Sequence, residues 1–133
     1  MKKRLLILLF AVIALAVLGF AYLQYGWIFY RYHSAACKER GKSYAARVEK
    51  LKRDARERLR IGTHKEDVIR FFQENGLPVS FDGNEYEGTI YTNGCAPAGC
   101  GSDAALLGLR VKADGSGTVI GDPVVGALYT NCL

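Results

Sequence analysis

The sequence is poor in the residues from which catalytic and cofactor sites are usually built. Its 133 residues include two histidines, His33 and His64, and no recognisable motif places either beside a nucleophile and an acid. No Lys or Arg occurs between Arg70 and Arg110, and no phosphate-binding loop with its lysine is present. We therefore expect no catalytic residue, no enzyme activity and no cofactor.

Charge is missing from one long stretch near the N-terminus. After Lys2-Lys3-Arg4, no charged side chain occurs from Leu5 to Tyr30. The 19 residues Leu5–Leu23 are mostly Leu, Ile, Val, Ala and Phe, and as a helix they would span about 28 Å, one hydrocarbon core. Aromatic residues of the kind that favours the headgroup region follow at Tyr22, Tyr25, Trp27, Phe29, Tyr30 and Tyr32. Residues 1–32 are therefore predicted to be a transmembrane anchor with an aromatic belt, spanning the lipid once.

Two other interpretations of this segment stay open. A cleaved signal peptide has the same basic start and apolar run, and Ser34-Ala35-Ala36-Cys37 is similar to a cleavage or lipidation site. The apolar run is long for a signal, however, and 13 residues separate Leu23 from Cys37. The uncleaved anchor is the favoured interpretation.

The orientation of the anchor is predicted from the cysteines, because basic residues flank the apolar run on both sides. All four cysteines lie beyond the run, and an even number in a small folded region is typical of an oxidising compartment. We expect a single-pass protein of the inner (cytoplasmic) membrane whose C-terminal domain is periplasmic or extracellular.

The charge distribution argues against a nucleic-acid partner. Residues 31–60 hold 11 Lys/Arg against 4 Asp/Glu, whereas residues 61–133 hold 4 Lys/Arg against 9 Asp/Glu. The sequence pI near 9.1 thus does not describe a basic globular surface. Residues 33–60 are predicted to be a basic helical stalk. It has one narrow apolar stripe at helical spacing, formed by Tyr44, Val48, Leu51, Ala55 and Leu59.

Three roles are compatible with this amphipathic helix. The first is that its stripe docks on the domain that follows. The second places its cations on anionic lipid beside the membrane span, and the third is a short dimeric coiled coil. We favour the first.

Residues 61–133 are predicted to form a small α+β domain, in which a short helix packs on an antiparallel β-meander. Thr63 and Glu66 have the spacing of a capping box at the start of that helix. Val68, Phe71 and Phe72 are its expected core residues. Asn75-Gly76 and Pro78 end it, and the period of the apolar residues then changes to two. Strands are expected at 79–81, 86–92, 106–113, 118–120 and 124–130, with a Gly/Pro-rich loop at 93–103.

The residues from Leu59 to Pro78 follow the pattern L-R-I-G-T-x-x-E-x-V-x-x-F-F-x-x-x-G-x-P. This pattern, followed by strands, resembles the SmpA/OmlA (BamE) outer-membrane lipoprotein domain and the repeat of β-lactamase inhibitory protein. The resemblance covers about residues 59–120 and implies an exported domain that binds proteins and does not catalyse. The chain departs from it in its spanning helix, its long basic stalk and its Cys-Ala-Pro-Ala-Gly-Cys loop.

Four cysteines permit three pairings. We favour Cys95–Cys100, which leaves Cys132 for Cys37 or free. A bridge from Cys132 into the 93–103 loop is the second possibility, because an up-down-up meander brings both to one end of the sheet. Four thiolates on zinc is disfavoured, because structural zinc sites usually use two tight C-x2-C pairs. No metal site is expected.

The leading functional hypothesis is a membrane-anchored envelope protein whose α+β domain binds or scaffolds another protein. A hydrophobic groove beside the helix, or an exposed patch at Tyr86 and Tyr91, would support it. The alternative is a thiol-active envelope protein using Cys95 and Cys100, although their spacing is not the redox C-x-x-C.

Overall fold

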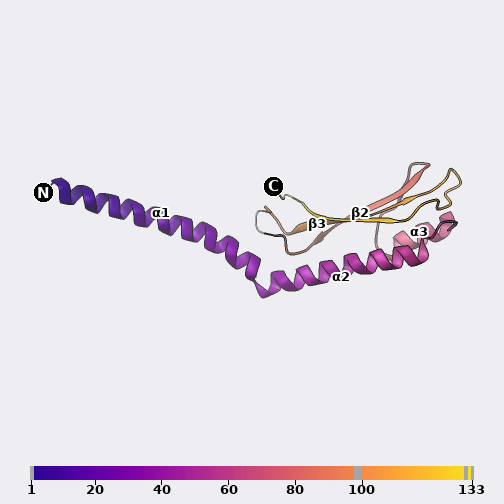
Figure 1. The fold of residues 1–133 in the computed structure, drawn as a ribbon, viewed down its shortest axis with the longest axis horizontal. Helices are drawn as coiled ribbons and strands as arrows, with labels where there is room; N and C mark the ends of the chain where they lie inside the picture. The colour runs from indigo at the N-terminus through magenta and orange to yellow at the C-terminus, as the bar shows by residue number, and fades with distance from the viewer. Residues whose placement is uncertain (1, 98–99, 131, 133) are drawn as a thin grey trace.

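The computed structural model describes the backbone of residues 2–97, 100–130 and 132, and their side chains except those of 2–6, 8 and 27–33. Within these residues the chain forms three helices and then four strands (Figure 1). The predicted α+β class is confirmed. The elements are α1 (Lys2–His33), α2 (Ala35–Arg58), α3 (Lys65–Glu74), β1 (Ser80–Phe81), β2 (Glu85–Asn93), β3 (Ala104–Lys112) and β4 (Val124–Tyr129).

The first helix, α1, extends away from the rest of the chain (Figure 1). It contains one window, Leu9–Gly26, that is long and apolar enough to cross a membrane, and no part of this window is buried. The helix continues to His33, beyond the predicted apolar run. The side chains expected to complete the aromatic belt, at residues 27, 29, 30 and 32, lie outside those that the structure describes.

Ser34 separates α1 from α2. Its backbone is extended, and its hydroxyl oxygen accepts a hydrogen bond from the Cys37 N–H, at 3.1 Å, so that it caps the new helix. The whole predicted stripe of α2 then joins the core cluster of the domain. The helix α2 therefore packs on the domain that follows it, which is the favoured one of the three roles expected for residues 33–60. Burial of its apolar stripe in the core of the domain stabilises the helix, as tertiary packing does for most amphipathic helices.

The four strands form one antiparallel sheet in the order β1-β2-β3-β4, which is the predicted meander. Residues 118–120 were expected to be a further strand, and this is wrong. Val119 makes an isolated bridge with Ala113, and its N–H donates to the carbonyl oxygen of Thr63 at 3.0 Å. The segment is shared between the end of the sheet and the turn before α3, so it extends no ladder.

The helix α3 begins one residue later than a capping box at Thr63 and Glu66 would place it. Its N-cap residue is His64, and no side chain caps it. The Thr63 hydroxyl instead donates to the carbonyl oxygen of Arg60 at 2.7 Å, so it closes the turn that connects α2 to α3. The capping-box prediction is therefore wrong, because Thr63 serves the preceding turn.

The C-terminal end of α3 is formed by Gly76, in the left-handed region with φ +66°. The N–H of Gly76 donates to the carbonyl of Gln73, and the N–H of Leu77 donates to the carbonyl of Phe72. These two bonds make a Schellman motif, which satisfies the carbonyls that the helix end leaves open. The expected core residues Val68, Phe71 and Phe72 are fully buried.

The core also depends on a close approach at Gly88 of β2. A Cβ atom there would meet the carbonyl oxygen of Pro78 and, at 2.9 Å, the ring of Phe72. Glycine therefore lets the backbone of β2 lie directly against the aromatic ring.

Replacing Val68 with Asp is expected to destabilise the domain by several kcal/mol, because a carboxylate would enter a fully buried apolar site without a partner. Gln73→Glu, which adds a carboxylate to the exposed side of the same helix, is the control and should change the unfolding midpoint little. Thermal unfolding of both variants, followed by near-UV circular dichroism, measures the difference. A Val68→Asp variant that melts like the wild type would contradict this core assignment.

Candidate protein-binding surface

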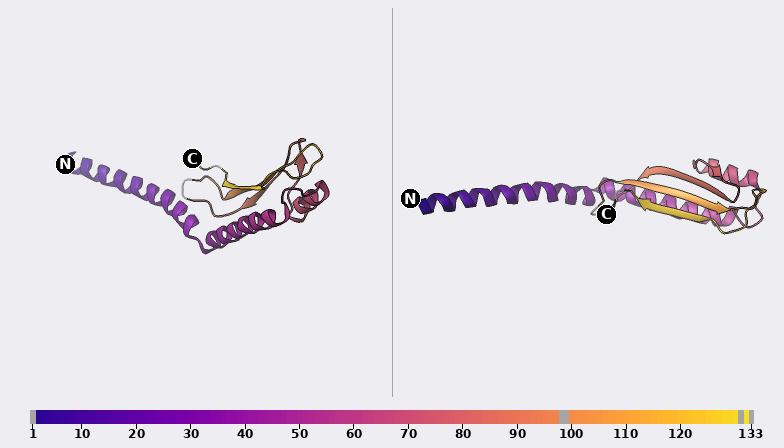
Figure 2. Two further views of the ribbon diagram at one scale, coloured as in Figure 1. Left: turned by 45° about the vertical axis from the view of Figure 1, so that its right-hand side comes forward. Right: turned by 90° about the horizontal axis from the view of Figure 1, so that it is seen from above.

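One face of the sheet is covered by helices and the other is not. Figures 1 and 2 show α2 and α3 on the same side of the strands, and no helix of the described chain on the opposite side. Successive side chains of a strand point to opposite faces, so each strand contributes alternate residues to the uncovered face. The register of the strands determines which of these residues are neighbours.

An apolar row crosses the uncovered face near the end from which α1 leaves. Tyr91 of β2 pairs with Leu106 of β3, which pairs with Leu128 of β4. Tyr91 is 80% exposed and Leu128 is 55% exposed, while Leu106 between them is half-buried. Large apolar side chains that are neighbours across three strands and open to solvent mark an interaction site more often than scattered ones do.

The next row along the strands has small side chains. Thr89, Gly108 and Gly126 are partners across β2, β3 and β4. A Cβ atom on Gly126 would have no atom within 4 Å, so the surface above this strand is open. We call these three residues the low row.

Charged side chains follow at the end of the sheet far from α1. Glu87 pairs with Arg110 and Glu85 with Lys112, so both acids lie on β2 and both cations on β3. Val124, which is 57% exposed, continues the Glu87–Arg110 row on β4. The uncovered face thus has an apolar row at one end, a low row in the middle and two charged rows at the other end.

The predicted patch of Tyr86 and Tyr91 does not exist, because the two rings lie on opposite faces of β2. Tyr86 is fully buried, stacks on Phe81 with ring centroids 4.4 Å apart, and donates from its hydroxyl to the Gly117 carbonyl oxygen at 2.9 Å. Burial raises the pKa of its phenol, as do the Glu66 and Asp114 charges. The two tyrosines are five positions apart, an odd number, which in a strand with period two implies opposite faces.

A hollow of about 480 Å³ lies beside the start of α3. Its lining includes Arg58 and Asp67, so it is not the hydrophobic groove that was expected. Arg58 itself pairs with Glu74 at 2.6 Å and lies over the Phe71 ring. This contact raises the pKa of Arg58 and lowers the pKa of Glu74. The pair links the C-terminal parts of the two helices.

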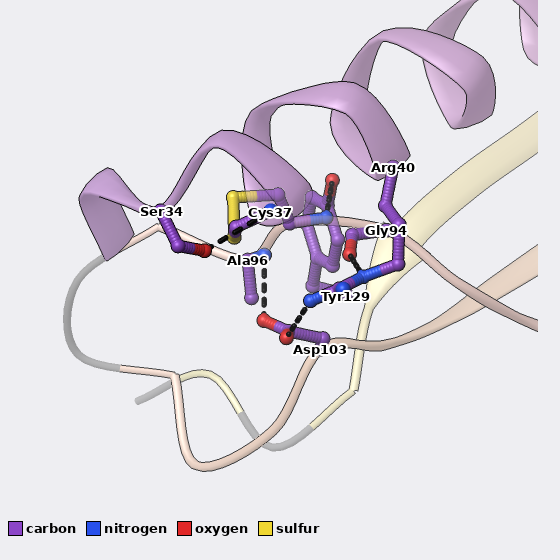
Figure 3. A network of polar contacts seen from close by, with 8 residues as sticks. Ser34, Cys37, Arg40, Gly94, Ala96, Asp103 and Tyr129 are labelled. Atoms are coloured by element: carbon purple, nitrogen blue, oxygen red, sulfur yellow. Dashed lines mark hydrogen bonds and ion pairs between the residues drawn. A yellow bond between two sulfur atoms is a disulfide. The ribbon is translucent and has the colours of Figure 1, made fainter. Parts of the chain in front are cut away.

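The end of the domain nearest α1 is fastened by polar contacts (Figure 3). The Arg40 guanidinium donates to Asp103 Oδ2 at 3.1 Å and to the Gly94 carbonyl oxygen. Asp103 Oδ1 in turn accepts from the Ala96 N–H at 3.2 Å. The first turns of α2 are thereby joined to both ends of the 93–103 loop.

Tyr129 and Tyr44 extend this fastening to β4 and to the middle of α2. The hydroxyl oxygen of Tyr129 accepts from the Cys95 N–H at 3.2 Å (Figure 3). The Tyr44 ring lies 5.4 Å from the Tyr129 ring, and its hydroxyl donates to the Leu106 carbonyl oxygen at 2.9 Å. Burial raises the pKa of Tyr44, with a further contribution from Tyr129. The Tyr44 hydroxyl therefore keeps its donor proton at neutral pH.

The four cysteines form two disulfides, Cys37–Cys95 and Cys100–Cys132. The prediction that they form disulfides is confirmed, but the favoured Cys95–Cys100 pairing is wrong. The second possibility, a bridge from Cys132 into the loop, is the one observed. The preference failed because the sequence does not fix where Cys37 lies relative to the 93–103 loop, whereas in the fold α2 packs on the sheet and Cys37 is bonded to Cys95.

These pairings bear on three other interpretations of the cysteines. Cys37 is bonded to sulfur and buried, so it is not a free site for lipid attachment. A thiol-active role would have to use one of the two observed bridges, since Cys95 and Cys100 belong to different ones. Among the described residues, no three His, Cys, Asp or Glu side chains gather to hold a metal ion.

Comparison with known protein families, curated proteins and solved structures found no match for this chain. The uncovered face therefore has to be interpreted from its own chemistry. The sequence predictions missed Leu106 and Leu128 as surface residues, because both lie in apolar strands and only the register shows which side chains face away from the helices. The sequence did carry a signal for them: in a strand, a residue an odd number of positions from a buried residue lies on the opposite face.

Peptide mapping of the oxidised full-length protein is expected to recover Cys37–Cys95 and Cys100–Cys132. The paired cysteines are 58 residues apart along the chain in the first bridge and 32 residues apart in the second. Loop-closure entropy then gives each a stabilisation of about 4 kcal/mol. Cys37→Ser/Cys95→Ser and Cys100→Ser/Cys132→Ser should each lose about this amount in chemical unfolding. Recovery of a Cys95–Cys100 peptide would contradict the observed pairing.

Proposed function

We propose that this chain is a single-pass membrane protein whose disulfide-bonded domain lies outside the cytoplasm and binds another protein. The observation that carries the proposal is the uncovered face of the sheet, with its exposed apolar row of Tyr91, Leu106 and Leu128. Tyrosine is enriched in protein interfaces because its ring adds a large contact area and its hydroxyl a hydrogen bond. A solvent-exposed row of this kind is stabilised when a partner covers it.

The membrane anchor is supported by the properties of α1. Its apolar window, Leu9–Gly26, is exposed all round, and a helix that is apolar on every side is stable in lipid rather than in water. Basic residues at 2–4 and the cations at the start of α2 flank the window. We propose that α1 spans the inner (cytoplasmic) membrane.

The placement of the domain is supported by its disulfides. Disulfides persist in oxidising compartments and are rare in the cytosol. Two bridges in a domain of about 100 residues favour a periplasmic or extracellular location. The resemblance to exported protein-binding domains leads to the same proposal, as a domain that acts by binding and has no catalytic role.

A topology reporter tests the location. A fusion after Leu133 to an enzyme that is active only outside the cytoplasm should be active, because the proposed anchor exports everything beyond it. The matched control is a reporter that works only in the cytoplasm, fused at the same position, which should be silent. The reverse pair of results would overturn the proposed orientation.

Photo-crosslinking in intact cells tests the binding function. A photoactivatable phenylalanine at Tyr91, in the apolar row, should give a discrete adduct with another polypeptide. The same group at Arg47, on the exposed side of α2, is the control and should give none. An adduct at Arg47 and none at Tyr91 would show that the binding surface is the helix and not the sheet.

A further inference from the structure

We infer that the uncovered face of the sheet binds a second copy of this chain in the same membrane, in a two-fold arrangement whose axis runs parallel to the strands. This inference rests on the proposed function and names its partner. The two sheets would pack face to face, with their strands aligned to within about 30°, as in β-sandwiches. Such an interface is isologous, because both copies use the same surface.

The charges of the face are arranged to complement a second copy. Glu85 and Glu87 lie on β2, and their cross-strand partners Lys112 and Arg110 lie on β3. A two-fold axis that passes between β2 and β3 exchanges the two columns. It sets each acid of one copy opposite a cation of the other, at the same height along the strands. Cross-strand pairs of like charge would instead bring like charges together under this operation.

The same operation matches the apolar residues. It sets Tyr91 of each copy opposite Leu106 of the other, with Leu128 beside them on the outer side. The Tyr91 ring is 80% exposed in a single copy, so it has the most apolar area to lose to a partner. Apolar rows therefore meet each other, and the charged rows meet at the far end.

The low row determines how closely the two sheets can approach. Thr89 of one copy faces Gly108 of the other, and Gly126 adds no side chain. Packed sheets lie about 10 Å apart, with side chains of the two faces interdigitating. A row of small residues between two rows of large ones leaves room for that interdigitation.

The direction of α1 favours this symmetry over pairing through the free edge of β4. The strands and α1 run along the long direction of the molecule, and α1 leaves from one end (Figures 1 and 2). An axis parallel to the strands keeps both anchors at the same end, so both can enter one membrane. Antiparallel pairing of two β4 edges would send the anchors to opposite ends. Confinement to one membrane also raises the effective concentration of the partner.

A charge-exchange experiment tests the inference with full-length protein in native membranes. Glu87→Arg makes its charged row wholly positive, and Arg110→Glu makes it wholly negative. Two differently tagged copies of either variant should co-purify at least about fivefold less than two wild-type copies, because two attractive contacts become repulsive. A Glu87→Arg copy expressed with an Arg110→Glu copy should co-purify as the wild type does.

Recovery of co-purification in the mixed pair is the decisive result. Within each variant the cross-strand pair at positions 87 and 110 has like charges, and only the other variant places an opposite charge across from each of them. The disulfide map of each variant shows that it has folded. The matched control is Glu57→Arg on the exposed side of α2, which should leave co-purification unchanged. Loss in both single variants without recovery in the mixed pair would overturn the inference.

A photoactivatable group at Thr89, in the centre of the face, separates the inference from the function on which it rests. An adduct between two copies of this chain supports both. An adduct with a different polypeptide, together with no co-purification of tagged copies, overturns the second-copy inference and leaves the protein-binding function standing. No adduct from Thr89 or from Tyr91 would overturn both.

Discussion

The burial of one narrow stripe of α2 against one face of the sheet is the constraint on which the rest of the structure depends. Val48, Leu51 and Ala55 lie in the same core as Val68 of α3 and Leu107 of β3. With its apolar side buried, α2 turns its many cations to solvent. The helices α2 and α3 both pack on one face and α1 extends away from the sheet, so no helix of the described residues covers the other face.

The two ends of the domain are held by different means. Near α1, the Cys37–Cys95 disulfide and the Arg40–Asp103 pair fasten α2 to the loop, and the Cys100–Cys132 disulfide fastens the loop to the chain beyond β4. At the far end, α3 is held by its apolar contacts in the core. The turn before it is held by backbone hydrogen bonds between Val119 and Gly62–Thr63. Fastening at both ends restrains the sheet, so a partner of the kind proposed above would not have to order the uncovered face on binding.

Local patterns in the sequence predicted the elements well, and non-local contacts were where they failed. The helix around Val68 and its end at Gly76 could be predicted because their signals are neighbours in sequence. The capping prediction at Thr63 failed because its hydroxyl can either cap α3 or close the turn from Arg60. It closes the turn, in which the Thr63 carbonyl oxygen also accepts a hydrogen bond from the distant Val119 N–H. The Cys37–Cys95 bridge depends on how α2 lies along the sheet. The apolar row depends on the register of three strands, which no single segment specifies.

The disulfide connectivity follows the order in which the cysteines occur: the first is joined to the second and the third to the fourth. During biosynthesis Cys37 precedes Cys95 by 58 residues, and Cys95 precedes Cys100 by five. If the domain is exported as proposed and each thiol pairs with the next one to emerge, with an oxidant of that compartment taking up the two electrons and two protons, the native pairs form directly. No bridge has to be broken by thiolate attack and remade. An order of this kind requires no isomerisation among the three connectivities.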